Sequence, residues 1–412
     1  MISKNTRLNT DKLNIDKSDA DKSDTGKLNT GKLNTGKLNT ANSKPFLLKP
    51  CGKDYLWGGS RLNDEYAKGI PMYPLAETWE CSTHPDGIST VAGGNWKGMP
   101  LTEVLRKHPE YLGEHPKYLH SYGGNQGELP VLIKLIDARS KLSVQVHPDD
   151  DYARRNEKGQ PGKTEMWYVL DADRDAQLLY GIYQDMDKET LYRSILDGTV
   201  ERYLQKVRIR KGEVYYVEAG TIHAIGAGAL IAEIQENSDL TYRMYDYGRV
   251  DKNGKRRELH IQKALEAANL KGSGRPVQPM RVLRYRNGYA SELLCRCKYF
   301  EVQRIVMNTE RCRQMAYYQS DRMSFRVLLC IGGCGVLLMD EGDTICFFKG
   351  GCIFFQAASV RVRLQELVIK NAEKGWLVPF QDVFRNVLQD ELRLWKIPGF
   401  SIINEETRSS KE

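Results

Sequence analysis

The feature that most restricts the fold of this chain is a long succession of short apolar segments separated by glycine-bearing turns. It begins at PFLLKPCGKDYLWGGSRL and includes VLIKLIDA, MWYVLDA and VYYV before about residue 270. A second stretch, from about 290 to 378, includes VLLCIGGCGVLLMD and CIFF. Many short strands at regular spacing with tight turns predict a β-sandwich or a small barrel.

The two β-rich stretches repeat the same order of elements. KGEVYYVEAG (211–220) can be laid beside KGGCIFFQAA (349–358), because both place a Lys-Gly turn before a strand with paired aromatic residues. We therefore predict two copies of a jelly-roll module. The second contains no histidine, since the last of the seven in the chain is His260, so we expect it to be structural.

Helical periodicity appears in three places within this β-rich pattern. LTEVLRKHPEYLGE (101–114), KETLYRSILDG (188–198) and ELHIQKALEAANL (258–270) have apolar residues at helical spacing. The first of these predicts a small helical insertion in the first module.

Composition divides the 412 residues into four parts. Residues 1–44 have no aromatic side chain and repeat KLNTG, which predicts a disordered tail. We expect a first domain at 45–280, a second at 281–380, and an extension at 381–412. The extension contains the amphipathic QDVFRNVLQDELRLWKIPGF, which would either cover its own domain or dock on a partner.

Cysteine content favours a cytosolic protein, and the net charge leaves the kind of ligand open. The net charge is +8, but nine basic against five acidic residues in the tail account for +4 of it. The rest is weak evidence for nucleic-acid binding and would equally suit a protein that handles an anionic metabolite. The nine cysteines are scattered without a C-x-x-C pair, and no apolar run is long enough to cross a bilayer.

Four side chains from separate motifs form a plausible set of metal ligands. In VQVHPDD (144–150), Gln145 and His147 share one face of a strand that Pro148 ends. Glu165 begins the aromatic-rich strand of GKTEMWYVL, and His223 stands in the glycine-flanked turn GTIHAIG. Two imidazoles, a carboxylate and an amide oxygen suit Zn²⁺ or Fe²⁺.

The stretch IAEIQENSDLTYRMYDYGR (231–249) brings further polar residues close together in the sequence. Arg243 near a metal would stabilise developing negative charge or bind a phosphate, with Glu233 and Asp239 beside it. The alternative is a solvent-facing loop with local ion pairs, and spacing alone does not decide between the two.

These motifs together resemble the type I mannose-6-phosphate isomerases, in particular their short bacterial form. The resemblance lies in LIDARSKLSVQVHPDD, GKTEMWYVL, AGTIHAIGAG and EIQENSDLTYRMYDYGR, with GKDYLWGG (52–59) and AETWECSTHPDG (76–87) before them in the same order. It covers about 45–380 and is weaker after 290. It implies a mainly β fold of two tandem cupin-like jelly rolls, with a small helical insertion in the first.

The resemblance also implies a role for particular residues. It implies one Zn²⁺ per chain, held by Gln145, His147, Glu165 and His223. The family's essential arginine corresponds to Arg243. Three further active-site groups correspond to Lys163, Glu233 and Asp239.

The implied reaction interconverts mannose 6-phosphate and fructose 6-phosphate through a cis-enediol. A base moves a proton between C2 and C1, while zinc polarises the sugar oxygens and Arg243 stabilises the enediolate. Lys163, Glu233 and Asp239 all remain candidates for the base. The pathway served is not visible in the sequence.

Two alternatives to this function are a cupin Fe²⁺ dioxygenase and a non-catalytic sugar-phosphate sensor. Gln145, Lys163 and Arg243 suit a charged sugar better than an oxygen site, and a complete ligand set argues against a sensor. Metal identity, oxygen uptake and turnover would separate the three. We expect a sugar phosphate as the partner, no nucleic acid and no membrane, and a monomer or homodimer in the cytoplasm.

Overall fold

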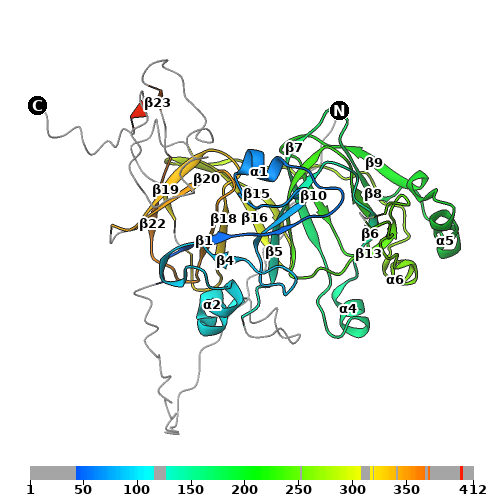
Figure 1. Cartoon of the computed structure of the whole chain (residues 1–412), viewed down its shortest axis with the longest axis horizontal. Coiled ribbons are helices and arrows are strands. Elements are labelled where there is room, and N and C mark those ends of the chain that lie inside the picture. Colours follow the sequence, from blue (N-terminus) through cyan, green and yellow to red (C-terminus); the bar gives the residue numbers. More distant parts are fainter. Residues whose placement is uncertain are drawn as a thin grey trace, which may run out of the picture. The chain divides into compact units, whose positions relative to one another are not determined.

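The computed structural model describes residues 43–115, 127–250, 253–307, 316–318, 320–339, 342–366, 370–371 and 400–401 (Figure 1). The tail predicted for 1–44 lies outside this part except for Ser43 and Lys44. The extension predicted for 381–412 lies outside it except for Phe400 and Ser401, which pair as β24 (Phe400–Ser401) with β23 (Lys370–Asn371).

Two sheets that pack face to face form what we call the first block, and one of them is a six-stranded antiparallel sheet. Its order is β10-β7-β12-β5-β3-β2. The strands are β2 (Cys51–Lys53), β3 (Glu77–Cys81), β5 (Val131–Ala138), β7 (Glu165–Ala172), β10 (Val214–Val217) and β12 (Ala229–Glu236). Strands β5 and β7 begin where the apolar segments predicted them.

A five-stranded sheet packs face to face against it, in the order β13-β6-β11-β8-β9. Its strands are β6 (Val144–Val146), β8 (Gln177–Ile182), β9 (Leu204–Arg208), β11 (His223–Ile225) and β13 (Tyr242–Tyr245). Apolar side chains from both sheets meet in one cluster, with Ile136, Val169 and Ile231 from the first and Leu178 and Ile225 from the second. This cluster fills one end of the sandwich, and the polar residues described below occupy the other.

Two helices cover the outer face of the five-stranded sheet, α5 (Lys188–Leu196) and α6 (Ile261–Ala267) (Figure 1). Leu191 of α5 and Leu265 of α6 join a second apolar cluster with Val144 and Val146. Helix α5 begins after Asp187, whose carboxylate accepts the backbone N–H of Thr190 as an N-cap. The predictions at 188–198 and 258–270 are confirmed, although α6 is shorter than predicted.

The remaining helices in the described part of the chain are short. They are α1 (Arg61–Tyr66), α2 (Leu101–Lys107), α4 (Asp150–Asn156) and the 3-10 helices η2 (Gly94–Trp96), η3 (Pro109–Leu112) and η5 (Val200–Arg202). The insertion predicted at 101–114 is confirmed as α2 followed by η3, because Pro109 interrupts the α-helix. Helices α1 and α4 were not predicted.

What we call the second block consists of further antiparallel sheets. Residues after 280 form most of it, and two short strands from the first hundred residues complete one of its sheets. Their orders are β14-β15-β16, β17-β22-β19-β20 and β18-β21-β1-β4. The strands are β1 (Phe46–Lys49), β4 (Thr90–Val91), β14 (Arg284–Arg286), β15 (Tyr289–Arg296), β16 (Glu301–Met307), β17 (Ala316–Tyr318), β18 (Arg326–Leu329), β19 (Cys334–Met339), β20 (Thr344–Phe348), β21 (Cys352–Phe355) and β22 (Val362–Glu366). The prediction of a mainly β protein is confirmed.

The first strand of the described chain belongs to a sheet of the second block. In register, Phe46 of β1 lies opposite Phe354 and Leu48 lies opposite Cys352 on β21. The rings of Phe46 and Phe354 stack with their centroids 5.4 Å apart. The two blocks therefore share hydrogen-bonded strands as well as packed side chains.

Lys68, one partner of a buried ion pair, also links the blocks. The ammonium of Lys68 lies 2.6 Å from a carboxylate oxygen of Glu80, and these side chains are 3% and 0% exposed. Lys68 also donates to the carbonyl oxygen of Gly350 in the turn before β21, and Thr78 donates to Glu80. Since alternate residues of a strand face opposite sides, Thr78 and Glu80 of β3 point away from the face that carries Glu77 and Trp79.

Among the residues that the structure describes, no helix has both the length and the apolar character that crossing a bilayer requires.

Candidate active site

The five-stranded sheet places three of the predicted residues side by side. Strand β6 lies between β13 and β11, and its Gln145 lies opposite Arg243 of β13 and His223 of β11. Directly opposed residues of antiparallel strands point to the same face, so the three side chains share a face. His223 is the first residue of β11 rather than part of a turn, which corrects the prediction for this position. His147 follows β6 directly.

Glu165, the first residue of β7, approaches both histidines from the facing sheet. One of its carboxylate oxygens lies 3.3 Å from Nε2 of His223, and the other lies 3.6 Å from Nε2 of His147. All three side chains are buried. The separate motifs thus meet at one point between the sheets.

Hydrogen bonds hold both imidazole rings with Nε2 directed at Glu165. Nδ1 of His147 lies 2.8 Å from the carbonyl oxygen of Leu240, and Nδ1 of His223 lies 2.9 Å from that of Thr221. A carbonyl oxygen only accepts, so each Nδ1 carries the proton and each Nε2 offers a lone pair. Nε2 of His147 and both carboxylate oxygens of Glu165 are buried without any hydrogen-bond partner.

These unpartnered atoms fit a tetrahedral metal ion. Ligand atoms at zinc-bond lengths of about 2.0–2.1 Å in a tetrahedron lie roughly 3.3 Å apart, close to the separations seen here. The side-chain amide of Gln145 lies 3.4 Å from Nε2 of His223, and turning it by 180° presents its oxygen in place of its nitrogen. Within the described part of the chain, the three His and Glu side chains form the one cluster of this kind.

Electrostatics at the cluster favour the ligand forms of the histidines. Burial, and then the positive charge of Lys163, lowers the pKa of His147 well below its usual value, and burial lowers the pKa of His223 to about 4. Both rings are therefore neutral at pH 7. Burial and the negative charge of Glu233 raise the pKa of Glu165 to about 8. A divalent cation would supply the counter-charge that this carboxylate lacks, although Lys163 Nζ lies 3.3 Å away.

Glu233 stands next to the ligand cluster on the six-stranded sheet. By register it lies between Trp167 of β7 and Lys134 of β5. The indole N–H of Trp167 donates to one Glu233 oxygen at 2.9 Å, and the same indole packs edge-on against His223. Glu233 is 4% exposed, so the interpretation of 231–249 as a solvent-facing loop is wrong for this residue.

Lys134 is a site residue that the sequence analysis missed. Its ammonium lies 3.6 Å from Glu233, 3.7 Å from Glu77 and 3.6 Å from Asp239, and 4.7 Å from the ring centre of Trp79. Burial alone would lower the pKa of Lys134, but the three carboxylates raise it above its usual value. A lysine inside the apolar run VLIKLIDA is the feature that could have revealed it.

The other two predicted residues lie at the edge of this group. Burial by itself would raise the pKa of Asp239, but Lys134 and Lys163 lower it, so the carboxylate is ionised at neutral pH. Arg243 donates from Nη1 to the carbonyl oxygen of Glu258, and its Nε is buried without a partner. Burial lowers the pKa of Arg243.

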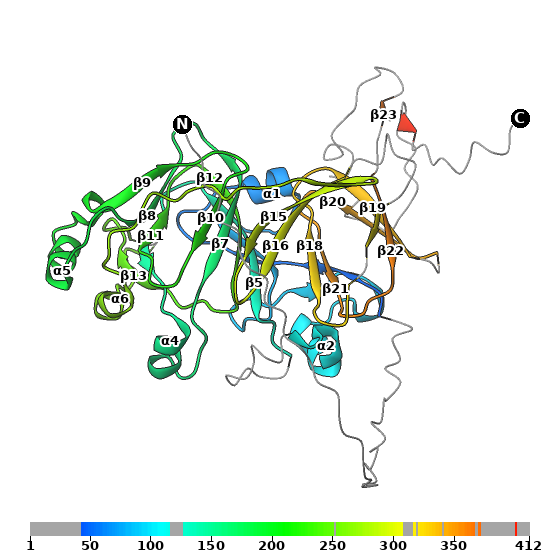
Figure 2. The same ribbon diagram turned by 180° about the vertical axis from the view of Figure 1, so that it is seen from behind.

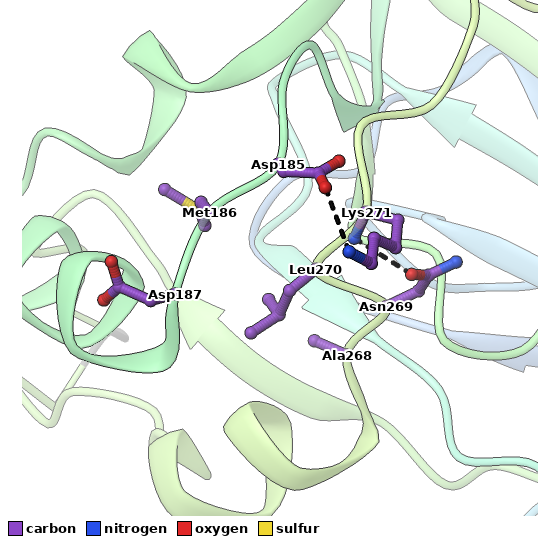
Figure 3. A pocket seen from close by; sticks show the side chains of 7 residues that line it. All are labelled: Asp185, Met186, Asp187, Ala268, Asn269, Leu270 and Lys271. Atoms are coloured by element: carbon purple, nitrogen blue, oxygen red, sulfur yellow. Dashed lines mark hydrogen bonds and ion pairs between the residues drawn. The ribbon is translucent and has the colours of Figure 1, made fainter.

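A depression of about 590 Å³ lies elsewhere, between the segment after β8 and the segment after α6 (Figure 3). Its lining includes Asp185, Met186 and Leu270, and Lys271 is paired with Asp185 across it. None of the predicted site residues lines it. Its exposed ion pair is already satisfied, so the candidate site remains the cluster between the sheets.

Comparison with known proteins gives one consistent result. The model of the type I phosphomannose isomerase catalytic domain matches residues 46–176. Mannose-6-phosphate isomerase ManA of Bacillus subtilis is 41% identical over 225 residues, which is 54% of this chain and 68% of ManA. The mannose-6-phosphate isomerase of Streptococcus mutans is 37% identical over 260 residues, 63% of this chain and 78% of that protein. The crystal structure of the mannose 6-phosphate isomerase from Bacillus subtilis superposes with a TM-score of 0.69 at 35% identity, covering 78% of this chain and 96% of that one.

Proposed function

This chain belongs to the type I phosphomannose isomerases, and from that premise we propose how its residues interconvert mannose 6-phosphate and fructose 6-phosphate. Relatives of 35–41% identity that are aligned over most of their length support the aldose–ketose isomerase activity. They favour neither the dioxygenase nor the sugar-phosphate sensor.

We assign Gln145, His147, Glu165 and His223 as the ligands of one Zn²⁺ per chain. The observation that supports this most strongly is the set of buried, unpartnered atoms on His147 and Glu165, at separations suited to a tetrahedral ion. When bound, Zn²⁺ acts as a Lewis acid that polarises the sugar oxygens and stabilises negative charge on them.

The reaction requires two proton relocations on the open-chain sugar. The hydrogen on C2 of mannose 6-phosphate leaves as a proton, and the C1 aldehyde becomes the hydroxyl-bearing carbon of a cis-enediol. Return of a proton to C1 gives fructose 6-phosphate, while the O2 hydroxyl loses its proton and O1 gains one. A base close to C1 and C2 can carry the proton between the two carbons.

We propose Glu233 as this base, out of the three candidates that the sequence leaves open. Its negative charge acts directly on the ligand Glu165, so it lies beside the metal site, and Trp167 fixes one of its oxygens. Asp239 is a weaker base because Lys134 and Lys163 lower its pKa. In this proposal Lys134 orients Glu233 and Asp239.

Two further groups would stabilise charge. Lys163 stands 3.3 Å from Glu165, where its positive charge would favour the ionised carboxylate that binds a metal. Arg243, whose Nε is buried without a partner, would face the negative charge of the enediolate.

We further propose that the fold is a tandem pair of cupin-like jelly rolls, with the catalytic module at 45–280 and a non-catalytic one at 281–380. The likeness of the two Lys-Gly turns supports this. Gly212 and Gly350 both have left-handed φ angles, 88° and 94°, and each is followed by one residue before its strand, β10 or β21, begins. Strand β1 would then be exchanged from the first module into a sheet of the second.

A coupled assay of fructose 6-phosphate formation tests the proposed function. We would measure turnover of mannose 6-phosphate before chelation, after chelation, and after returning Zn²⁺ or Fe²⁺, while recording oxygen uptake. We expect activity that is lost on chelation, restored by Zn²⁺ and absent in His147→Ala, with no oxygen consumed. A folded, zinc-loaded protein with no turnover would refute the proposal, and Glu233→Gln with wild-type kcat would refute the assignment of the base.

The same preparation tests the remaining expectations about the molecule. We expect a monomer or homodimer in solution and a sugar phosphate as its ligand, without affinity for nucleic acid or membranes. Light scattering coupled to gel filtration measures the oligomeric state. A titration with duplex DNA or lipid vesicles measures affinity for nucleic acid or membranes. Fluorescent tagging in a bacterial cell would test the cytoplasmic location.

A further inference from the structure

The loop that joins two of the proposed ligands is closed at its neck. Residues 148–164 leave after His147, form α4, and return just before Glu165. The N–H of Lys163 donates to the carbonyl oxygen of Pro148 at 3.0 Å. Gly162 packs so closely on the outgoing chain that a Cβ there would lie 2.5 Å from the backbone of Asp149. The two sides of the neck are therefore coupled, and a displacement of the neck would change the distance between His147 and Glu165.

Two carboxyl groups support this neck. Asp150 accepts the N–H of Gly162 on Oδ1 at 3.1 Å. Glu236, buried at the end of β12, accepts the N–H of Thr164 at 2.7 Å and donates its own N–H to the carbonyl oxygen of Thr164. Thr164 immediately precedes Glu165, so both contacts bear on the strand that carries the ligand.

The second oxygen of Asp150 is held by the second block. The hydroxyl of Tyr299 donates to Oδ2 at 2.8 Å, and the ammonium of Lys298 lies 3.2 Å from the same atom. Both residues belong to the tight turn between β15 and β16, which run beside β10 and β7 (Figure 2). The second module has no proposed metal ligand of its own, yet it contacts the loop that joins two proposed ligands of the first module.

We propose that Tyr299 and Lys298 are positioning residues of the metal site, acting through Asp150. By holding Asp150 they fix the neck at Gly162 and so keep Lys163 and Glu165 at the correct distance from His147. A metal site needs its ligands placed to within a few tenths of an ångström, which a loop held only at its two ends does not provide. This inference rests on the proposed zinc site and adds a role for the second module.

The first test compares Tyr299→Phe with Tyr285→Phe, a tyrosine on β14 of the same sheet that is 77% exposed. We would measure the dissociation constant for Zn²⁺ by competition with a chromophoric chelator, without sugar, together with kcat, KM and Tm. We expect Tyr299→Phe to raise the dissociation constant by up to about tenfold, the lower end of the range for direct hydrogen-bond partners of metal ligands, because Tyr299 acts through Asp150. Its kcat should fall while KM stays within about twofold, and Tyr285→Phe should match the wild type.

The second test asks whether Tyr299 acts through Asp150. Asp150→Ala removes the bridge, and Asp151→Ala on the same turn of α4, whose side chain is 79% exposed, controls for the charge of the helix. If the proposal holds, Asp150→Ala weakens zinc binding and adding Tyr299→Phe weakens it no further. Additive effects of the two substitutions would overturn the pathway.

A lower Tm in Tyr299→Phe with an unchanged zinc dissociation constant would show a merely structural role and overturn the proposal. Lys298→Met supplies a second variant should Tyr299→Phe fold poorly, and we expect a smaller change in the same direction. The outcome is separate from that of the proposed reaction. An inactive wild type that still binds Zn²⁺ would refute the isomerase activity and leave this comparison intact.

Discussion

Substituting Lys68 by Met should destabilise the protein without altering its chemistry. The substitution leaves the Glu80 carboxylate fully buried, with only the hydroxyl of Thr78 still donating to it. The carbonyl oxygen of Gly350, in the turn of the second block, loses its donor as well. Breaking a buried ion pair by removing one partner costs about 3–5 kcal/mol, because the remaining charge is uncompensated.

This free energy converts into a measurable shift in melting temperature. With an unfolding entropy of about 2 cal/mol/K per residue over roughly 300 ordered residues, 3–5 kcal/mol lowers Tm by about 5–8 °C. The kcat at 25 °C should stay at the wild-type value. Glu80 and Lys68 lie on the face of β3 opposite to Glu77 and Trp79, which belong to the site.

Differential scanning calorimetry of Lys68→Met, Glu80→Gln and the double variant would measure this. We expect the double variant to recover most of the loss of Lys68→Met, since it no longer buries an unpaired charge. A shift below about 2 °C in Lys68→Met, or additive losses in the double variant, would refute the argument from burial. A large fall in kcat at 25 °C would show that the two faces of β3 are not independent.

Three further outcomes follow from the site. Removing the metal should lower Tm, because a ligand at 100 times its dissociation constant stabilises the folded protein by about 2.7 kcal/mol. Chelator titration followed by calorimetry measures this shift. His147→Ala should show no metal-dependent shift in Tm. Trp167→Phe removes the hydrogen bond to Glu233. A hydrogen bond to a charged group contributes about 1.5–3 kcal/mol, so we expect kcat to fall about tenfold or more. Steady-state kinetics measures kcat, and the zinc content should be unchanged. Burial, and then Asp150, raises the pKa of Glu236 to about 8 from its ordinary 4.5. Folding therefore favours the protonated form of Glu236. The stability that this group contributes is complete below pH 4.5 and is lost as the pH rises through 8. Glu236→Gln cannot ionise, so Tm scans from pH 5 to 9 should show a smaller fall than in the wild type, and an identical profile would contradict the assigned burial.

The strands, and the four residues that we propose as ligands, could be recognised in the sequence because both depend on local pattern. Apolar alternation defined β5 and β7, and Gln145, His147, Glu165 and His223 stood out as polar side chains at the ends of apolar strands. Helix α4 escaped prediction because Ala153 is its one buried side chain, which leaves no apolar period to recognise.

Strand register accounts for most of what the sequence did not reveal. Lys134 becomes part of the site only when β5 pairs with β3 and β12, which brings carboxylates from separate segments around its ammonium. The contact between Tyr299 and Asp150 likewise joins residues far apart in the chain. Such pairings depend on long-range packing, and no short motif encodes them.

The pairing of β1 with β21 has a consequence for how the chain is made. Phe46 leaves the ribosome about 300 residues before its partner Phe354, which at 5–20 residues per second is a delay of roughly 15–60 s. During that interval the segment FLLK has no strand on the side where β21 will lie, and its apolar residues need protection from other nascent chains. Strand β1 is therefore made early but completes its pairing only after β21 has been synthesised. A chaperone that binds the FLLK segment during this interval should raise the yield of active protein.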